Sequence, residues 1–306
     1  MWLIWGLVDS MGVTLRQLAV FVAVTDHDGF GAAAVALSLS QSSVSHSLAS
    51  LEASVEGELM HRAAPVRPTA LGEVLLPHAR ATLAAARAFD AAAAAHTSDT
   101  ATGTINLSVP PTVARGLLPE LLRLWHEHLP RLEVTIFEAV DDEIHQWLEN
   151  GTVDAAFLID PDPFPHGGLH VATDAYEAVV RSDHPLAGEE SIALADLLED
   201  PLLVTTSGFG PPIERLHALA GLPYRPARHI RELMTLLSMV EAGIGVAILP
   251  SLAASMLSDT LTLVPLLPRL ERRLVLTGPT TRPWHPNVTA IRDLTPGESR
   301  SQTHRM

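Results

Sequence analysis

Between Ser40 and Glu52 the chain carries short hydrogen-bonding side chains, interrupted by apolar residues at helical spacing. Ser40 is suited to cap this helix, because its hydroxyl can accept a bond from a first-turn amide. A helix that reads base edges in the major groove needs short polar groups, since they let its backbone lie deep in the groove. A serine-rich, solvated face on an ordinary helix is the alternative interpretation. The residues expected to contact base edges are Gln41, Ser42, Ser43, Ser45 and His46.

The residues before this run predict the elements that would position it. The segment 14–17 has the sequence of a capping box and opens a first helix. Apolar residues spaced from Phe30 to Leu37 predict a second, shorter helix. Only a tight turn fits between this helix and Ser40. The predicted arrangement is therefore a helix-turn-helix.

The residues after the run suit a wing. Segments 59–62 and 66–68 bracket a small turn, and Thr69 is placed to cap a long helix. Phosphate contacts need cations, and the chain contains no lysine, so arginine has to provide them. The residues expected to contact phosphate or the adjacent minor groove are Arg16, Arg62 and Arg67.

Residues 14 to about 72 resemble the winged helix-turn-helix of LysR-type transcription regulators, and the spacing is kept without a gap. The family usually has Pro-Ala where Ser42-Ser43 stand and Arg where His46 stands. These positions lie on the base-reading face, so the resemblance does not indicate the operator sequence. The segments that carry it are Leu15-Arg16-Gln17-Leu18, Phe30 with Ala33-Ala34, Ser40-Gln41 with Val44-Ser45, Leu51-Glu52, Leu59-Met60-His61-Arg62 and Thr69-Ala70-Leu71-Gly72.

Composition narrows the function classes. The 306-residue chain has a formal net charge of −15, but residues 1–95 hold only a small part of this excess. It contains no cysteine, which excludes disulfides, thiolate metal sites and a catalytic thiol. The segment 126–128 lacks the histidine spacing of a zinc helix, and 243–245 lacks the third glycine of a dinucleotide fingerprint. We expect no cofactor, no metal and no enzymatic activity.

An alanine-rich helix and a polar hinge are expected before a second domain. Leu71, Leu75, His78, Thr82, Ala85 and Phe89 recur at heptad spacing, but His78 and Thr82 are polar, so the stripe is not a strong coiled-coil seam. Its small residues permit the close approach of a second helix, and the family resemblance implies that this helix forms a dimer. Packing of this helix on its own domain is the alternative. The expected divisions are an N-terminal extension (1–13), the DNA-binding domain (14–69), the linker and dimerisation helix (70–95), the hinge (96–103), the effector-binding domain (104–294) and a disordered tail (295–306).

From Thr104 onward, strands and helices alternate, which predicts α/β units with a parallel sheet covered on both faces. A first subdomain, an inserted second one and a return predict a two-lobed sensor. The first lobe would span 104–171 and 270–294, and the second would span 172–269. The family resemblance covers this region through weaker motifs: Asn150-Gly151-Thr152-Val153-Asp154, His184-Pro185-Leu186-Ala187 and the segment 240–250.

Ligands in such α/β units bind outside the carboxyl ends of the strands, near helix N-termini. This rule points to the segments after the first and second strands and to 205–208 in the second lobe. The family resemblance implies that several of these residues line an effector cleft, and we expect a small molecule, with a lean to a carboxylate. Helix capping is the alternative role for Thr112 and Ser207. The expected ligand-binding residues are Pro110, Thr112, Asp141, Thr205, Ser207, Gly208 and His229.

The segment Met1–Val8 is apolar but too short for a membrane span, and it lacks the basic leader of a signal peptide. We favour Met11 as the translation start, with a small extension packed on the first helix as the alternative. The resemblance implies a cytoplasmic regulator that binds an operator in double-stranded DNA, responds to a small effector and forms a homodimer or homotetramer, without a membrane partner. The alternatives are a regulator without a diffusible effector, and a two-lobed solute-binding protein or enzyme.

Overall fold

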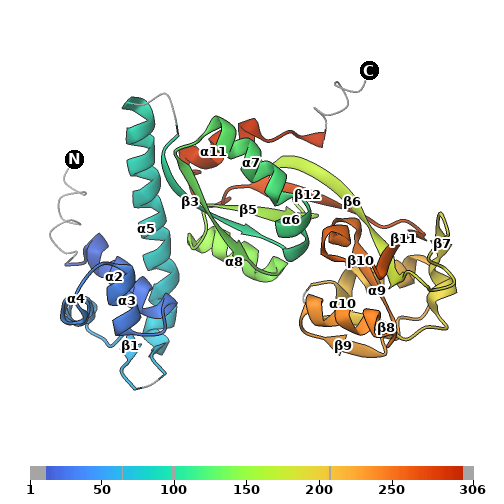
Figure 1. Cartoon of the computed structure of the whole chain (residues 1–306). Coiled ribbons are helices and arrows are strands. Elements are labelled where there is room, and N and C mark those ends of the chain that lie inside the picture. Colours follow the sequence, from blue (N-terminus) through green and yellow to red (C-terminus); the bar gives the residue numbers. More distant parts are fainter. Residues whose placement is uncertain (1–11, 64, 98–100, 207, 299–306) are drawn as a thin grey trace.

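The computed structural model describes residues 12–63, 65–97, 101–206 and 208–298 (Figure 1). A helical unit comes first in the chain, followed by one long helix and two α/β lobes. Within these ranges, no helix combines the length and apolar character that a membrane span requires. The N-terminal extension up to Met11, and with it the question of the start, lies outside the described residues. So do 98–100 of the expected hinge and 299–306 of the expected tail.

The N-terminal unit has the predicted helix-turn-helix and wing. Its elements are α2 (Leu15–Asp26), α3 (Phe30–Ala36), α4 (Gln41–Ser54), β1 (Met60–His61) and β2 (Arg67–Pro68). Thr14 and Gln17 form both bonds of a capping box at the start of α2. At α4 the Ser40 hydroxyl accepts a 3.1 Å hydrogen bond from the amide of Ser43. Apolar side chains of all three helices meet in one core, and the wing strands pair antiparallel.

The long helix α5 (Ala70–Thr97) lies between this unit and the first lobe and contacts both (Figure 1). The Thr69 hydroxyl caps it by accepting a bond from the Gly72 amide. Ala79 of α5 is buried in the core of the N-terminal unit, and Ala84 is buried where α5 meets Gly151 of the first lobe. Most of the predicted heptad stripe is exposed, with Phe89 exposed by 74%.

The first lobe is a sheet with helices on both faces, as the strand–helix alternation predicts. Its elements are β3 (Gly103–Val109), α6 (Pro111–Gly116), α7 (Leu118–His128), β4 (Leu132–Glu138), α8 (Asp141–Asn150), β5 (Ala155–Ile159), β12 (Glu271–Thr277) and α11 (Pro286–Leu294). β3 pairs in parallel with β4 and β5, while α7 and α11 pack on one face and α8 on the other. The sheet is mixed rather than wholly parallel, because β12 returns from the second lobe and pairs antiparallel with β5.

The second lobe has its own mixed sheet and its own core. Its elements are β6 (Leu169–Arg181), β7 (Ile192–Ala193), η1 (Leu194–Leu197), β8 (Leu202–Thr205), α9 (Gly210–Leu219), β9 (Arg228–Ile230), α10 (Leu233–Glu241), β10 (Val246–Pro250), η2 (Ser251–Met256) and β11 (Leu261–Leu267). β8 pairs in parallel with β9 and β10, whereas β6 pairs antiparallel with β10 and β11. Because β6 also pairs with β12, one continuous strand belongs to both lobes.

The expectation of a disordered tail from Thr295 is wrong for the described residues 295–298. The Thr295 hydroxyl is buried and accepts a 3.0 Å hydrogen bond from the indole N–H of Trp125. Glu298 accepts a 2.6 Å bond from the hydroxyl of Thr173 on β6. These polar side chains are ordered because each meets a partner from the first lobe or the crossing strand.

Candidate functional site

The exposed side of α4 and the start of α2 form one polar groove. The predicted DNA-contacting residues that line it are Arg16, Ser42, Ser43 and His46. Gln17 connects the two helices, because its side-chain amide donates a 2.9 Å hydrogen bond to the Ser50 hydroxyl. Gln41 is exposed at the first position of α4, and Ser45 is half-buried, so both lie beside the groove rather than in its lining.

The two wing arginines have different surroundings. Arg67 is exposed on β2 and has no ion pair or hydrogen bond to any described residue. Arg62 donates a 2.9 Å hydrogen bond to Glu52 of α4, whose side chain is almost fully buried. A carboxylate oxygen of Glu52 also accepts a 2.9 Å bond from the amide of Leu59. One buried carboxylate therefore joins the wing to the expected base-reading helix.

Sequence reasoning missed this role of Glu52. The residue follows Leu48 by four positions and therefore lies on the buried side of α4. A carboxylate at such a position needs hydrogen-bond donors, because burying an unpaired charge is costly. That spacing is the signal that would have identified it.

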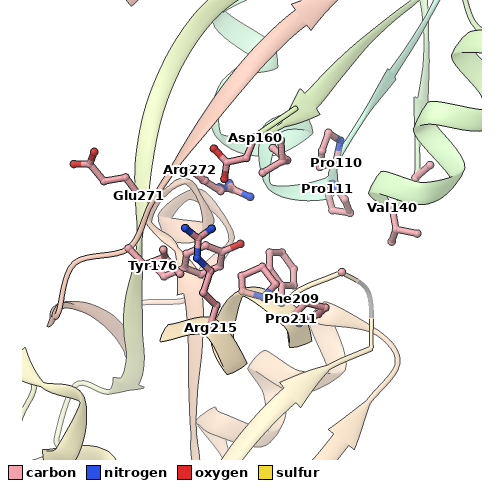
Figure 2. A pocket seen from close by; sticks show the side chains of 15 residues that line it. Pro110, Pro111, Val140, Asp160, Tyr176, Phe209, Pro211, Arg215, Glu271 and Arg272 are labelled. Carbon is pink, nitrogen blue, oxygen red and sulfur yellow. The ribbon is translucent and has the colours of Figure 1, made fainter. Parts of the chain in front are cut away.

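A cleft of about 290 Å³ lies between the two lobes (Figure 2). Prolines and a valine from the first lobe form one wall, and Phe209 with two prolines from α9 forms the opposite wall. Charged side chains complete the cleft, and in Figure 2 the Arg215 guanidinium points away from its own helix. The principal lining residues are Pro110, Pro111, Val140, Asp160, Tyr176, Gly208, Phe209, Pro211, Pro212, Arg215, Glu271 and Arg272.

Two of the expected ligand-binding residues, Pro110 and Gly208, line this cleft. Pro110 is the N-cap of α6, directly after β3, and Gly208 precedes α9. Both follow the rule that ligands bind beyond the carboxyl ends of strands. Ser207 lies outside the described residues, as does the side chain of Asp141 at the start of α8, so their roles stay predictions.

Three other expected residues do not line the cleft, which corrects the prediction. Thr112 is completely buried, and its hydroxyl accepts a 3.0 Å hydrogen bond from the guanidinium of Arg272. Thr205 is buried within β8, and His229 is exposed on the edge strand β9, away from the cleft lining. The physical reason for Thr112 is that α6 turns its hydroxyl inward, where a buried cation needs an acceptor.

Arg272 lies where the chain passes between the lobes and is only 2% exposed. Its guanidinium forms two hydrogen bonds with the carboxylate of Asp174 on β6. Asp174 also accepts a 3.2 Å bond from the amide of Leu252 in η2. The buried ion pair thus joins β6, β12, η2 and, through Thr112, α6.

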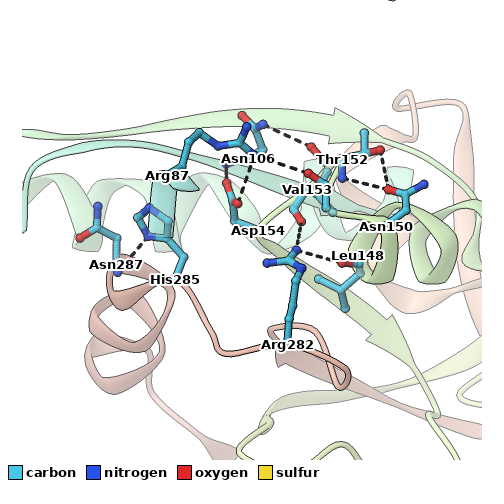
Figure 3. Close-up of polar contacts among 11 residues, drawn as sticks. Arg87, Asn106, Leu148, Asn150, Thr152, Val153, Asp154, Arg282, His285 and Asn287 are labelled. Carbon is cyan, nitrogen blue, oxygen red and sulfur yellow. Dashed lines mark hydrogen bonds and ion pairs between the residues drawn. The ribbon is translucent and has the colours of Figure 1, made fainter. Parts of the chain in front are cut away.

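A second polar cluster joins α5 to the first lobe (Figure 3). The Arg87 guanidinium lies 3.5 Å from the Asp154 carboxylate, which is 1% exposed. The other oxygen of Asp154 accepts a 3.0 Å bond from the amide of Asn106. Gly151 has a φ of +82°, and a Cβ there would come within 2.8 Å of an alanine Cβ of α5. The segment that carries Gly151 and Asp154 is therefore the surface on which α5 packs.

Two more basic side chains surround Asp154 in this joint (Figure 3). His285 is buried, and its Nδ1 accepts a 3.2 Å hydrogen bond from the amide of Asn287. Burial lowers the pKa of His285 below its ordinary value, against the opposing effect of the Asp154 carboxylate. Burial also lowers the pKa of Arg282, which donates to the carbonyl oxygens of Leu148 and Val153. His285 is therefore the neutral member of the cluster at pH 7.

Family models match both the N-terminal helix-turn-helix and the two-lobed domain of this chain. Residues 15–73 match the model of the "Bacterial regulatory helix-turn-helix protein, lysR family". Residues 98–298 match the model of the "LysR substrate binding domain". Together these matches cover nearly all of the polar groove on α4, the wing and both walls of the cleft.

Individual relatives span most of the chain. It is 30% identical over 245 residues to the HTH-type transcriptional regulator YvbU of Bacillus subtilis, covering 79% of this chain and 83% of the relative. It is 33% identical over 245 residues to a probable hydrogen peroxide-inducible genes activator of Mycobacterium avium, covering 78% of each. Its fold is similar to a full-length OxyR variant of Pseudomonas aeruginosa, with a TM-score of 0.72, 23% identity and coverage of 92% and 94%.

Proposed function

Because the chain belongs to the LysR family of bacterial transcription regulators, we propose that α4 reads an operator and that a small molecule in the inter-lobe cleft adjusts DNA affinity. The protein is a DNA-binding regulator and not an enzyme. One observation carries the proposal: an exposed groove of short polar side chains on a helix-turn-helix, in the same chain as a two-lobed ligand-binding domain.

For the DNA-binding face, we assign base-edge contacts to the exposed residues of α4 and phosphate contacts to arginines beside them. Arg67 is free to meet phosphate, and Arg16 lies in the groove wall. Arg62 would have to give up part of its bond with Glu52 to do the same. Base-edge contacts would come from Gln41, Ser42, Ser43, Ser45 and His46.

For the signal, we propose a bound small molecule rather than oxidation of a thiol. The relative from Mycobacterium avium is named for induction by hydrogen peroxide. Reversible peroxide sensing by thiol chemistry needs a reactive cysteine, and this chain has none. A ligand that prefers one arrangement of the lobes would shift the population of DNA-binding states instead.

For assembly, we propose a homo-oligomer built on pairing of α5 with α5 of a second copy. The exposed apolar side chains of Leu71, Val74 and Phe89 on α5 support this, because large exposed apolar side chains favour a partner. A dimer would present two base-reading helices to two half-sites. We place this activity in the cytoplasm, where bacterial DNA is found.

A mobility-shift assay with the DNA immediately upstream of the protein's own gene tests the proposal. We expect a shift that competitor DNA of unrelated sequence removes only at large excess. Treatment with hydrogen peroxide should leave the shift unchanged. Failure to bind that DNA or any genomic fragment would contradict the assignment of α4 as the helix that reads an operator. A peroxide-dependent shift would contradict the proposed signal while leaving the DNA-binding role intact.

A further inference from the structure

Two of the three helices that begin at the cleft, α6 and α9, have paired prolines at their starts, whereas α8 begins after Val140 without one. Pro110 and Pro111 start α6 in the first lobe, and Pro211 and Pro212 lie in the first turn of α9. Helix N-termini commonly hold anions through their unpaired amide hydrogens. Proline has no amide hydrogen, so these four positions offer apolar rings to a ligand instead of donors. Anion binding by the main chain is therefore weakened at the starts of α6 and α9, one on each side of the cleft.

The hydroxyls of the two threonines in this region are also withdrawn from the cleft, although Tyr176 lines it. Thr112 is fully buried and bonded to Arg272, and Thr205 is 1% exposed within its strand. Figure 2 shows rings on both sides: Pro110 and Pro111 on one, Phe209 and Pro211 on the other. An apolar body is the ligand part that these surfaces fit, because burying it removes apolar area from water without leaving polar groups unpaired.

Most of the charged side chains in the cleft already have partners. Arg272 is paired with Asp174, and Glu271 forms a 2.9 Å ion pair with Arg269. Asp160 accepts a 2.8 Å hydrogen bond from the amide of Arg273. Each of these charged groups has a hydrogen-bond or ion-pair partner within the protein and does not require one from a ligand.

Arg215 differs from them. It is exposed, it lies one helical turn after Pro211 on the cleft side of α9, and it forms no hydrogen bond or ion pair with any residue in the described part of the chain. Its guanidinium carries five donors in a planar fork that matches a carboxylate. Among the described residues that line the cleft, Arg215 is thus the only cation without an acidic partner.

We propose that the cleft binds a small apolar monoanion, with the acid group on Arg215 and the apolar body between the two proline pairs. This inference rests on the proposed function of the cleft. A volume of about 290 Å³ is at the small end of ligand pockets, which selects a compact molecule. The carboxylates of Asp160 and Glu271 in the same lining oppose a second negative charge, which disfavours dianions.

Matched pairs of acids and neutral amides test this directly. The probes are phenylacetate against phenylacetamide and hexanoate against hexanamide, titrated into the full-length protein by isothermal calorimetry. The wild type should bind each acid about tenfold or more tighter than its amide, the range expected for a charge-assisted hydrogen bond. Arg215→Gln should remove that preference and leave amide affinity within about twofold. Arg228→Gln, an exposed arginine of the same lobe outside the cleft lining, is the control and should keep it.

The outcomes separate this inference from the proposed function. Equal affinity for acid and amide, or an acid preference that survives in Arg215→Gln, would overturn the monoanion assignment while the cleft remained a binding site. No binding of any of the four probes at millimolar concentration would also overturn it. The mobility shift with upstream DNA is measured on the same protein without any probe. Absence of that shift would contradict the proposed function, independently of the calorimetric result.

Discussion

The guanidinium of Arg87 on α5 lies 3.5 Å from the buried carboxylate of Asp154 in the first lobe. Arg87→Met keeps the apolar stem but leaves this carboxylate oxygen without its cation. We expect a loss of about 1–2 kcal/mol in the free energy of unfolding, moderated because Arg87 is nearly half exposed. Urea unfolding measures it. In an Asp154→Asn background the same change should cost less, and equal costs in the two backgrounds would show that the pair is not coupled.

Gly151→Ala should separate α5 from the first lobe. The new Cβ would meet α5 at 2.8 Å and would also occupy a backbone with φ of +82°. Gly221→Ala is the matched control, because its φ is +67° but no atom lies within 4 Å of the added Cβ. We expect Gly151→Ala to be the more destabilising by roughly 1–3 kcal/mol, the cost of overpacking. Equal losses of unfolding free energy in the two variants would mean that α5 accommodates the added Cβ of Gly151→Ala without destabilising the protein.

His285 makes stability depend on pH. Its pKa is lowered in the folded protein by burial, so the unfolded chain binds the proton more readily as pH falls below about 6.5. Stability from this group is therefore complete above that pH and is lost as pH falls through and below it. Arg87, Arg282 and Asp154 face the same ring, and the two arginines strengthen the effect while Asp154 weakens it.

The measurement for His285 is urea unfolding from pH 5 to pH 8. His285→Asn keeps an acceptor for the amide of Asn287 but cannot titrate. As the solution becomes acidic, the unfolding free energy of the wild type should fall relative to that of the variant. A difference that is constant across the range would show that His285 does not titrate in this way.

Thr112→Val should destabilise the protein instead of acting through direct ligand contact. The hydroxyl accepts a 3.0 Å bond from buried Arg272, and valine has the same shape without the acceptor. We expect a loss of about 1–3 kcal/mol, the cost of leaving a buried donor unpaired. Thr104→Val, at an exposed position of β3, is the control and should stay within about 0.5 kcal/mol. Stability is measured by thermal and urea unfolding. If Thr112→Val is as stable as the wild type, Arg272 has found another hydrogen-bond acceptor.

Arg67→Ala tests the wing. Loss of one phosphate contact should weaken binding to operator and unrelated DNA alike and reduce the slope of log affinity against log salt by about 1. Gln41→Ala should instead narrow the affinity difference between these two DNAs. Fluorescence anisotropy at several salt concentrations provides both readings, with Arg228→Ala in the second lobe as the charge control. An unchanged salt slope in Arg67→Ala would show that Arg67 of the wing does not contact DNA phosphate.

The helix-turn-helix could be predicted closely because its signals are local. Ser40 caps a helix three residues from its bonding partner, and the apolar stripe of α4 is complete within the helix. The parallel pairing of β3, β4 and β5 also follows from strand–helix alternation. In each case, the residues that determine the structure are close together in the chain or repeat with a fixed period.

The cleft could be predicted only in part, because side-chain direction there depends on distant partners. The rule for strand ends pointed to Pro110 and Gly208, and both line the cleft, while their contact with a ligand stays a prediction. Thr112 lies beside them but is turned inward by Arg272, which is 160 residues away. Arg215 carries no sequence motif, and only the fold places it on the cleft side of its helix.

The thirteen-residue strand β6 pairs with β12 in the first lobe and with β10 and β11 in the second, without a break. A ligand that draws the lobes together would therefore have to bend this one continuous, hydrogen-bonded strand. The free energy of that bending comes from ligand contacts and is recovered when the ligand leaves. We expect such a connection to act elastically, so that the lobes return to their original separation when the effector leaves and no second signal is needed to reset the regulator.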